Sequence, residues 1–297
     1  MNERHLAVNV DLDSISLYFQ LHGLDPAAAD EIVYERAVPR FLELFERCGV
    51  KATFFIVAQD LERGDNWAQA RALVEAGHEI GNHTFTHPYD LIHRPAEEIF
   101  SETKRAHVVL SELNAGPIVG FRAPGYNVSP AVYKALTRLG YVYDSSILPS
   151  PPYLLAKYAV MGALALRGKR SRSIVGNPWQ MFASPQPGTR HGVWEIPISV
   201  LPVARVPVIG TSLALFGERF GQLCVRTLRH QRVVNLEFHG VDLLSLHDDP
   251  IARPLAAQSD LRVPVAKKLE VFRRTIRGLA QSHEPLRLDA LVWRLPR

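Results

Sequence analysis

The sequence has little cysteine and no long apolar run, and each absence excludes a class of protein. Only two of its 297 residues are cysteines, and the spacing of Cys48 and Cys224 supports neither a disulfide scaffold nor a zinc ribbon. Both are expected to be reduced thiols in the core. No run of about 18 apolar residues exists, so no segment is expected to span a bilayer by itself.

Charge of one sign is not in large excess either. The chain has 34 basic and 30 acidic residues and a formal net charge of +4, which is too small to indicate a nucleic-acid partner. Residues 1–5 lead directly into an apolar strand, without the apolar segment and cleavage site of a secretory signal. With 47% hydrophobic and 22% charged residues the composition is globular, and a cytoplasmic location is expected.

Short strand-like segments alternate with segments of helical period, which predicts an α/β fold with a mainly parallel sheet. Strands are expected at residues 6–13, 52–58, 78–84, 118–123, 141–146, 193–199 and 233–239, with a short late strand at 286–288. Amphipathic helices are expected at residues 30–48, 96–113, 130–139 and 263–279. The strand count approaches that of a barrel, so one domain over residues 1–297 is expected, with a long insertion at about 148–190.

The strong polar signals lie at the carboxyl ends of predicted strands, where barrel enzymes gather their active-site loops. The first strand ends in Asp11-Leu12-Asp13, and strand alternation places both carboxylates on one face. Two buried carboxylates on one face are costly unless a cation pairs with them. An acidic pair that only caps or closes a loop is the alternative.

Histidines follow the third predicted strand. His83 and His87 are four residues apart, so a helical turn would put both imidazoles on one face. Histidine and carboxylate together suit Zn²⁺ or a similar divalent ion. A catalytic zinc site needs three protein ligands and one open position, and the acidic pair on the first strand could complete it.

Two further polar residues close predicted strands. Arg122 ends the strand at 118–123, where it fits a structural ion pair that keeps Asp11 ionised. His239 ends the strand at 233–239, where a histidine is either a hydrogen-bonded core group or a proton donor.

In this order, the segments resemble the NodB-homology polysaccharide deacetylases, carbohydrate esterase family 4. The resemblance runs from about residue 6 to 245 and rests on Asp11, Asp13, the string Gly-His-Glu-Ile-Gly-Asn-His-Thr-Phe-Thr-His at 77–87, Arg122-Ala123-Pro124 and His239. It implies a distorted (β/α)7-8 barrel and a carbohydrate deacetylase or deformylase. Such an enzyme hydrolyses an N-acyl amide on a sugar with the help of a metal ion.

The resemblance also implies roles for single residues. Asp13, His83 and His87 would hold one divalent metal ion, with zinc favoured over iron, cobalt or nickel. Asp11 would be the general base, oriented by Arg122, and His239 the general acid. A backbone N–H near Gly125 and Tyr126 would stabilise the oxyanion.

Two features depart from the family pattern. Leu12 separates the aspartates that the family commonly has side by side. A downstream Asp-Trp pair is also missing, so the acid that tunes His239 stays open among Asp144, Glu195 and Asp242.

Residues 193–199 and 207–210 are similar to a segment of the exosortase-associated deacetylases and of the undecaprenyl-phosphate formamidoarabinose deformylases. This implies an acetylated or formylated amidosugar, linked to a polyprenyl phosphate, in an envelope glycan pathway. Within the insertion, an apolar segment at 153–166 is followed by four basic residues, Arg167, Lys169, Arg170 and Arg172. The pattern fits peripheral contact with an anionic membrane, on the cytoplasmic face of the inner membrane, or with a lipid phosphate. A helix packed on the barrel before a solvated basic loop is the alternative.

Two other functions remain open from the sequence. The same barrel and metal could serve a hydrolase of a small non-sugar amide, since a fold does not fix a substrate. A non-catalytic glycan-binding protein with a degenerate site is the other.

Overall fold

The computed structural model describes residues 3–25, 32–169 and 171–296, and their strands form one sheet. β1 (His5–Leu12) lies between β2 (Thr53–Ile56) and β8 (Val233–His239), parallel to both. Beyond β2 the parallel order continues through β3 (Glu79–Asn82), β4 (Gly120–Phe121), β5 (Tyr143–Asp144) and β7 (Val193–Glu195). β6 (Gly188–Arg190) pairs antiparallel with β7, and β9 (Glu284–Pro285) pairs with β1.

The barrel has a seam between β7 and β8, which are the ends of its parallel path among the described residues. The chain that follows β7 bridges this seam. Ser199 N–H donates to the Asn235 carbonyl at 2.9 Å, and Ile209 forms an isolated bridge with Glu237 of β8. This arrangement is a distorted (β/α) barrel, so the expected fold class is confirmed.

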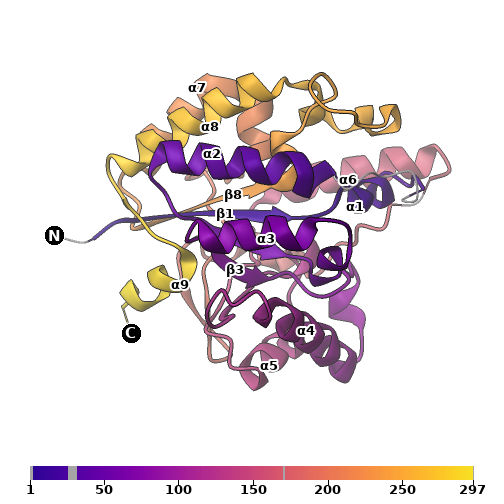
Figure 1. Ribbon diagram of the computed structural model, residues 1–297, viewed down its shortest axis with the longest axis vertical. Helices are drawn as coiled ribbons and strands as arrows, with labels where there is room; N and C mark the ends of the chain where they lie inside the picture. Colours follow the sequence, from indigo (N-terminus) through magenta and orange to yellow (C-terminus); the bar gives the residue numbers. More distant parts are fainter. Residues whose placement is uncertain (1–2, 26–31, 170, 297) are drawn as a thin grey trace.

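Helices cover the outside of the sheet in two groups (Figure 1). One side carries α2 (Val38–Cys48), α7 (Gly210–Leu228) and α8 (Val265–Ala280), and the other carries α3 (Asn66–Glu75), α4 (Ala96–Ser111) and α5 (Pro130–Arg138). The sequence explains their ends. Ser129 Oγ accepts the Val132 N–H at the start of α5, and α2 stops at Gly49, whose φ of 67° is left-handed.

Further helices and turns connect these elements. They are α1 (Ile15–Leu21), α6 (Pro151–Leu166), α9 (Leu288–Leu291), a π-helical turn at Val33–Ala37, and 3-10 turns at Ala58–Glu62, Leu91–His93, Pro124–Tyr126, Pro178–Phe182, Gly240–Leu243, Arg253–Ala257, Ser259–Arg262 and Val292–Arg294. α1 and α6 lie at the end of the barrel towards which β1 runs (Figure 1). Among the described helices, none is both long and apolar enough to cross a bilayer.

Some expected elements differ from the observed ones. The strand at 286–288 is wrong, because β9 lies at Glu284–Pro285 and Leu288 starts α9. The Leu288 N–H donates to the side-chain hydroxyl of Thr53, and not to a backbone carbonyl of a neighbouring strand. β4 and β5 are also only two residues long. Of the helix expected at 30–48, residues 30–31 lie outside the described residues, and a π-helical turn precedes α2.

The core fills the space between the sheet and the helices. Every residue of β1 is buried. Phe41 and Phe45 of α2 pack on Phe54 of β2 and Phe238 of β8, with ring centroids 6.0 to 6.4 Å apart. Both cysteines are free, and Cys224 is buried while Cys48 is partly exposed. This packing fixes the strands whose carboxyl ends carry the polar residues.

Candidate active site

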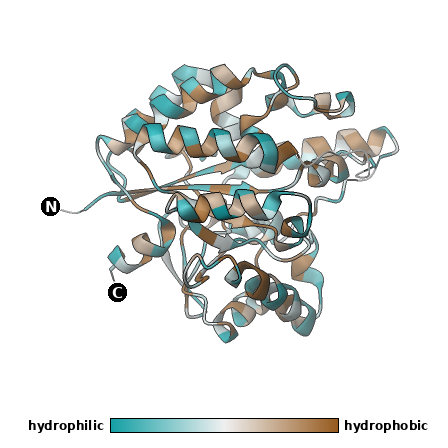
Figure 2. Cartoon of the chain, in the orientation of Figure 1, coloured by the Kyte–Doolittle hydropathy of each residue, from teal (hydrophilic) through white to brown (hydrophobic). Residues whose placement is uncertain are grey.

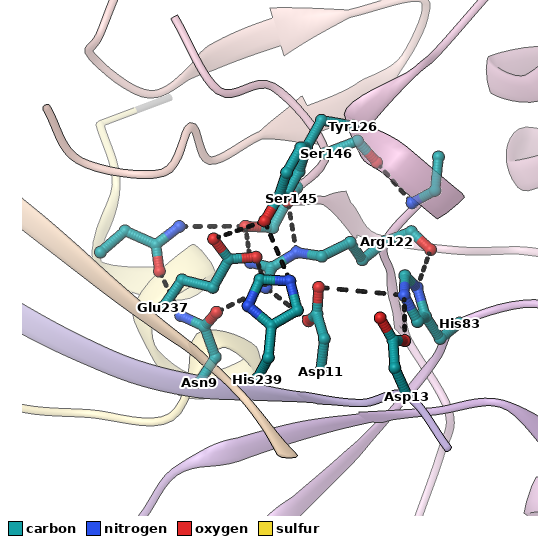
Figure 3. A network of polar contacts seen from close by, with 12 residues as sticks. Asn9, Asp11, Asp13, His83, Arg122, Tyr126, Ser145, Ser146, Glu237 and His239 are labelled. Atoms are coloured by element: carbon teal, nitrogen blue, oxygen red, sulfur yellow. Dashed lines mark hydrogen bonds and ion pairs between the residues drawn. The ribbon is translucent and has the colours of Figure 1, made fainter. Parts of the chain in front are cut away.

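Two adjacent strands present a row of polar side chains on the same face. The parallel register pairs Asn9 with Glu237 and Asp11 with His239. Because side chains alternate along a strand, these four lie on one face of the sheet. Asp13 follows β1 by one residue and continues the row. Figure 3 shows the side chains converging from β1 and β8.

A fully buried arginine organises this row. The Arg122 guanidinium uses its donors on five acceptors: Asn9 Oδ1 and Asp11 Oδ1 at 2.7 Å each, Glu237 Oε1 at 3.1 Å, the Ser145 carbonyl at 2.7 Å and Ser145 Oγ at 2.8 Å. Burial opposes its charge, but the carboxylates of Asp11 and Glu237 outweigh burial and raise the pKa of Arg122. The charge of Arg122 therefore fixes the orientation of Asp11.

Asp13, His83 and His87 come together beside Asp11. Asp13 Oδ1 lies 3.3 Å from His83 Nε2 and 3.5 Å from His87 Nε2, and all three residues are buried. His83 Nδ1 contacts the Arg122 carbonyl at 2.7 Å, which directs its Nε2 towards Asp13. Asp13 Oδ1 is buried without a hydrogen-bond partner among the described residues.

These distances fit a divalent cation. Ligand atoms about 2.1 Å from a tetrahedral Zn²⁺ lie about 3.4 Å from one another. The carboxylate oxygen and the two imidazole nitrogens have this spacing, and the orphaned oxygen is an acceptor that a cation would satisfy. The residues present therefore fit the metal that the sequence predicts.

The local backbone brings the two histidines together differently from the expectation. The expected helical turn is wrong, because residues 83–88 form an irregular loop with left-handed backbone at Thr84, φ 69°, and His87, φ 54°. Two short contacts close this loop. Asn82 Oδ1 accepts the Thr84 N–H at 2.7 Å, and Thr84 Oγ1 accepts the His87 N–H at 3.1 Å.

The pKa shifts of Asp13 and His87 favour cation binding. Burial lowers the pKa of His83, but Asp11 and Asp13 outweigh burial and raise that pKa. Burial raises the pKa of Asp13, but the imidazoles of His87 and His83 outweigh it and hold that pKa well below its usual range. Burial, aided by the charge of His83, lowers the pKa of His87 to about 4. Near neutral pH the site therefore offers a carboxylate and a neutral imidazole, which are the protonation states that bind metal.

His239 lies on the other side of Asp11 and is partly exposed. Its Nε2 lies 3.1 Å from the Tyr126 hydroxyl, which in turn donates to Glu237 Oε2 at 3.0 Å. Burial lowers the pKa of His239, but Glu237, then Asp11 and Asp242, outweigh burial and raise it to about 9. His239 therefore carries a proton near neutral pH.

The three acids considered as partners of His239 have different positions. Asp242 is near it, with Oδ2 at 4.0 Å from His239 Nδ1 and at 2.8 Å from its backbone N–H. Asp144 and Glu195 instead lie against each other, and burial and the Asp144 charge raise the pKa of Glu195. Ser146 donates to Asp144, and Tyr133 donates to Glu195.

Sequence reasoning missed Glu237, which belongs to the row on β1 and β8 and is the charged group with the largest effect on the pKa of His239. It is fully buried, and burial, with the nearby Asp11, raises its pKa against the opposing effect of Arg122. The signal was present. Asn235, Glu237 and His239 alternate along β8 as Asn9, Asp11 and Asp13 do at the first strand, which places each set on one face.

The residues expected at the oxyanion lie beside this row. Gly125 and Tyr126 occupy a 3-10 turn after β4, both with left-handed φ, 62° and 63°. The Tyr126 N–H donates to the Ala123 carbonyl at 3.2 Å, so the hydroxyl of Tyr126, not its amide, faces the site.

Among the described residues, the basic side chains of the insertion make no hydrogen bond or ion pair with the row on β1 and β8. Arg167, Lys169 and Arg172 follow α6, where Arg167 and Lys169 are exposed and Arg172 donates to Gln20 Oε1 at 2.9 Å. Arg170 lies outside the described residues.

Comparison with known proteins places the site in a family context. Residues 29–143 match a family model described as polysaccharide deacetylase. A peptidoglycan deacetylase of Helicobacter pylori is 25% identical over 149 residues, which are 48% of this chain and 49% of that protein. The chain spans about half the length of the curated relatives it matches.

Solved structures support the fold. A protein of Mycobacterium smegmatis described as a candidate polysaccharide deacetylase has a TM-score of 0.54 at 19% identity, over 96% of this chain and 93% of that one. A CE4 family pseudoenzyme from Bacillus anthracis has a TM-score of 0.53 at 14% identity, over 98% of this chain and 66% of that one. Residues 29–143 are therefore similar to polysaccharide deacetylases, and the two solved structures share the barrel fold of this chain.

Proposed function

We propose that this chain is a metal-dependent hydrolase that removes an N-acyl group, acetyl or formyl, from a sugar, within one catalytic domain over residues 1–297. The observation that carries the proposal is the convergence of Asp13, His83 and His87 around a carboxylate oxygen that has no hydrogen-bond partner among the described residues. This cluster lies next to Asp11, and His239 lies on the other side of Asp11. A small non-sugar amide as substrate, or glycan binding without turnover, would be outcomes of the test below.

Asp13, His83 and His87 would hold one divalent ion, for which zinc fits the donor set best. Such an ion, when bound, polarises the acyl oxygen and lowers the pKa of a water molecule. Asp11 lies beside these three residues, and its Oδ1 accepts from the Arg122 guanidinium at 2.7 Å. Asp11 would be the general base that accepts the proton of the attacking water.

His239 would be the general acid. Water adds to the acyl carbon, the C–N bond breaks, and the departing nitrogen needs a proton to leave as an amine. His239 carries that proton because Glu237, Asp11 and Asp242 raise its pKa to about 9. The Tyr126 hydroxyl contacts His239 Nε2 and keeps the imidazole turned into the site.

We further propose that the sugar is linked to a polyprenyl phosphate and that the chain works at an anionic membrane surface. What supports this is α6, whose outward face is apolar: Leu155, Tyr158, Val160 and Leu166 are 69%, 49%, 51% and 92% exposed. Figure 2 shows little hydrophilic colour along this helix. The cations that follow it would meet lipid phosphates.

Hydrolysis by purified protein tests the catalytic proposal. N-acetylated and N-formylated aminosugars are compared with small linear and cyclic amides, and bound metal is measured by plasma mass spectrometry. Asp13→Ala and His83→Ala are expected to lose both the metal and turnover by at least about 10³-fold. His230→Ala, an exposed histidine outside the site, is the matched control. Turnover by metal-free protein, or of the non-sugar amides alone, would contradict the proposal.

Vesicle co-sedimentation tests the membrane proposal separately. Replacing Arg167, Lys169 and Arg172 by Gln is expected to release the chain from anionic vesicles while hydrolysis of a short soluble sugar persists. Vesicle binding that is unchanged by these substitutions and by Leu155→Ser and Leu166→Ser would contradict the membrane proposal.

A further inference from the structure

A small pocket beside the catalytic row contains two donors that no part of the described chain uses. It lies between the turn at 124–126, the inward face of α6 and residues 175–181 of the insertion. Lys157, the one charged residue of α6, lines it together with Asn127 and Tyr126. Since the outward face of α6 is apolar, its single charge lies on the side that faces the protein.

Lys157 has no anionic partner there. It is partly buried, and the structure gives it no hydrogen bond or ion pair among the described residues. Burial alone lowers its pKa to about 8, with no opposing contribution from a nearby carboxylate. Burying an ammonium group costs free energy when the lost water is not replaced by an acceptor. A lysine with a purely structural role is therefore expected to have an anionic or carbonyl partner.

Asn127 supplies the second donor. It is only 7% exposed, and its Nδ2 has no hydrogen-bond partner among the described residues. The Gly176 N–H donates to Asn127 Oδ1 at 3.0 Å, which fixes the orientation of the amide and turns Nδ2 away from Gly176. A Cβ at Gly176 would lie 2.2 Å from that oxygen, so the contact requires glycine.

Both donors are directed to the same place. A Cβ built on Gly125 would lie 3.4 Å from Asn127 Nδ2 and 3.8 Å from Lys157 Nζ, so the two atoms flank one point above this glycine. The ammonium and the amide N–H lie close together, and neither has an acceptor among the described residues. An oxyanion could accept a hydrogen bond from both.

The pocket adjoins the proton donor of the proposed reaction. Tyr153, one helical turn before Lys157, packs edge to face on Tyr126 with ring centroids 5.5 Å apart. The Tyr126 hydroxyl contacts His239 Nε2 at 3.1 Å (Figure 3). A group bound at Lys157 would therefore adjoin the tyrosine that contacts the proposed proton donor.

We propose that Lys157 Nζ and Asn127 Nδ2 form an anion subsite that binds a phosphate or carboxylate group carried by the amidosugar. The inference rests on the proposed function for the identity of the sugar, but the subsite itself does not depend on turnover. It makes the chain selective for charged amidosugars over neutral ones.

Binding measured by calorimetry tests the subsite. The full chain, loaded with zinc, is titrated with neutral N-acetylglucosamine, with its 1-phosphate and with N-acetylmuramic acid, which carries a carboxylate. The chain is expected to prefer at least one charged sugar, and the preferred one identifies the anion. Lys157→Met is expected to reduce the affinity ratio of that sugar to the neutral one by about tenfold or more.

A second variant probes the other donor. Asn127→Asp keeps the oxygen that accepts the Gly176 N–H and replaces Nδ2 by a carboxylate oxygen, so the same ratio should fall at least as far. Lys157→Arg, which keeps the charge, should retain the preference. Lys134→Met on α5, an exposed lysine outside the pocket, is the matched control. The melting temperature of Lys157→Met should equal or exceed that of the native chain, because the variant removes a desolvated charge.

Two results overturn the subsite: equal affinity of the native chain for charged and neutral sugars, or a ratio that Lys157→Met and Asn127→Asp leave within about twofold. Failure of the proposed function is distinct. In that case no amide is hydrolysed, while the charge preference and its loss in the variants persist. Amide hydrolysis that persists alongside either of these two binding results removes the subsite alone.

Discussion

A single residue, Arg122, connects the structural and chemical parts of the site. Its guanidinium reaches Asn9 and Asp11 on β1 and Glu237 on β8, and it stacks 4.4 Å from the centre of the Phe55 ring on β2. The sequence indicated an ion pair with Asp11, which the structure shows. The contacts with the other strands could not be predicted, because they depend on which strands become neighbours in the barrel.

Glu237 is the residue whose role is tested most sharply by pH. It is the largest charged contribution that raises the pKa of His239, to about 9. A general acid works only while protonated, so activity should fall as the pH rises through that value. Glu237→Gln removes the charge, lowers the pKa of His239 and should move the alkaline limb of kcat/KM to lower pH.

The full pH dependence of kcat/KM for both proteins is the measurement. Asp242→Asn should move the same limb less, because Asp242 contributes less than Glu237 to the pKa of His239. A limb that stays in place in Glu237→Gln, with only a uniform loss of rate, would assign Glu237 a structural role.

Among the elements, the loop after β3 has a backbone conformation that the sequence did not predict. The spacing of His83 and His87 indicated a shared ligand set, but the helical turn assumed for it was wrong. Left-handed backbone at Thr84 and His87 brings the imidazoles together, and pattern rules for L-residues do not anticipate it. The loop is held instead by Asn82, which is fully buried.

Asn82 should therefore control metal affinity without touching the metal. Its Nδ2 donates to the Thr103 carbonyl at 3.0 Å and to the Tyr141 hydroxyl at 2.6 Å, while its Oδ1 accepts the Thr84 N–H. Asn82→Ala is expected to weaken zinc binding about 10- to 100-fold, as loss of an outer-shell contact typically does.

Competition with a chromophoric chelator measures that affinity. Thr103→Val, which removes a buried hydroxyl that donates to the Ile99 carbonyl on the neighbouring helix, is the control for general loss of packing. Equal zinc affinity in Asn82→Ala and the native chain would show that the loop is positioned by other contacts.

At the scale of the whole molecule, the barrel was predictable and its closure was not. Alternating strand and helix patterns indicated the parallel order, and β1 and β8 have nearly the expected bounds. The two-residue strands β4 and β5 and the seam at Ser199 are set by tertiary contacts that leave no periodic signal. The insertion was recognised from its length, whereas the pocket under α6 depends on which face of the helix turns inward.

Stability of the whole fold should depend on Glu79, a buried acid at the start of β3. Burial, with Asp289, raises its pKa from 4.5 to about 7 despite donors from Thr53, Tyr143 and the Asp289 N–H. Between these values the folded chain keeps a proton that the unfolded chain has lost. Unfolding free energy should therefore fall by about 1–3 kcal/mol as the pH rises from 4.5 to 7.

Urea unfolding of the native chain and of Glu79→Gln at a series of pH values separates this effect from other titrations. The unfolding free energy of the native chain should fall relative to that of Glu79→Gln between about pH 4.5 and 7, and the difference should then level off. A difference that is constant over this range would show that Glu79 is ionised in the folded state.

We propose that Asp13, His83 and His87 hold one metal ion that hydrolysis requires. Zinc is titrated into chelator-treated protein while hydrolysis of an N-acylated aminosugar is followed. Activity is expected to be absent without metal, to rise linearly, to level off at one equivalent and not to return in His83→Ala. Full activity without added metal, or its recovery by zinc in His83→Ala, would show that these residues do not hold such an ion.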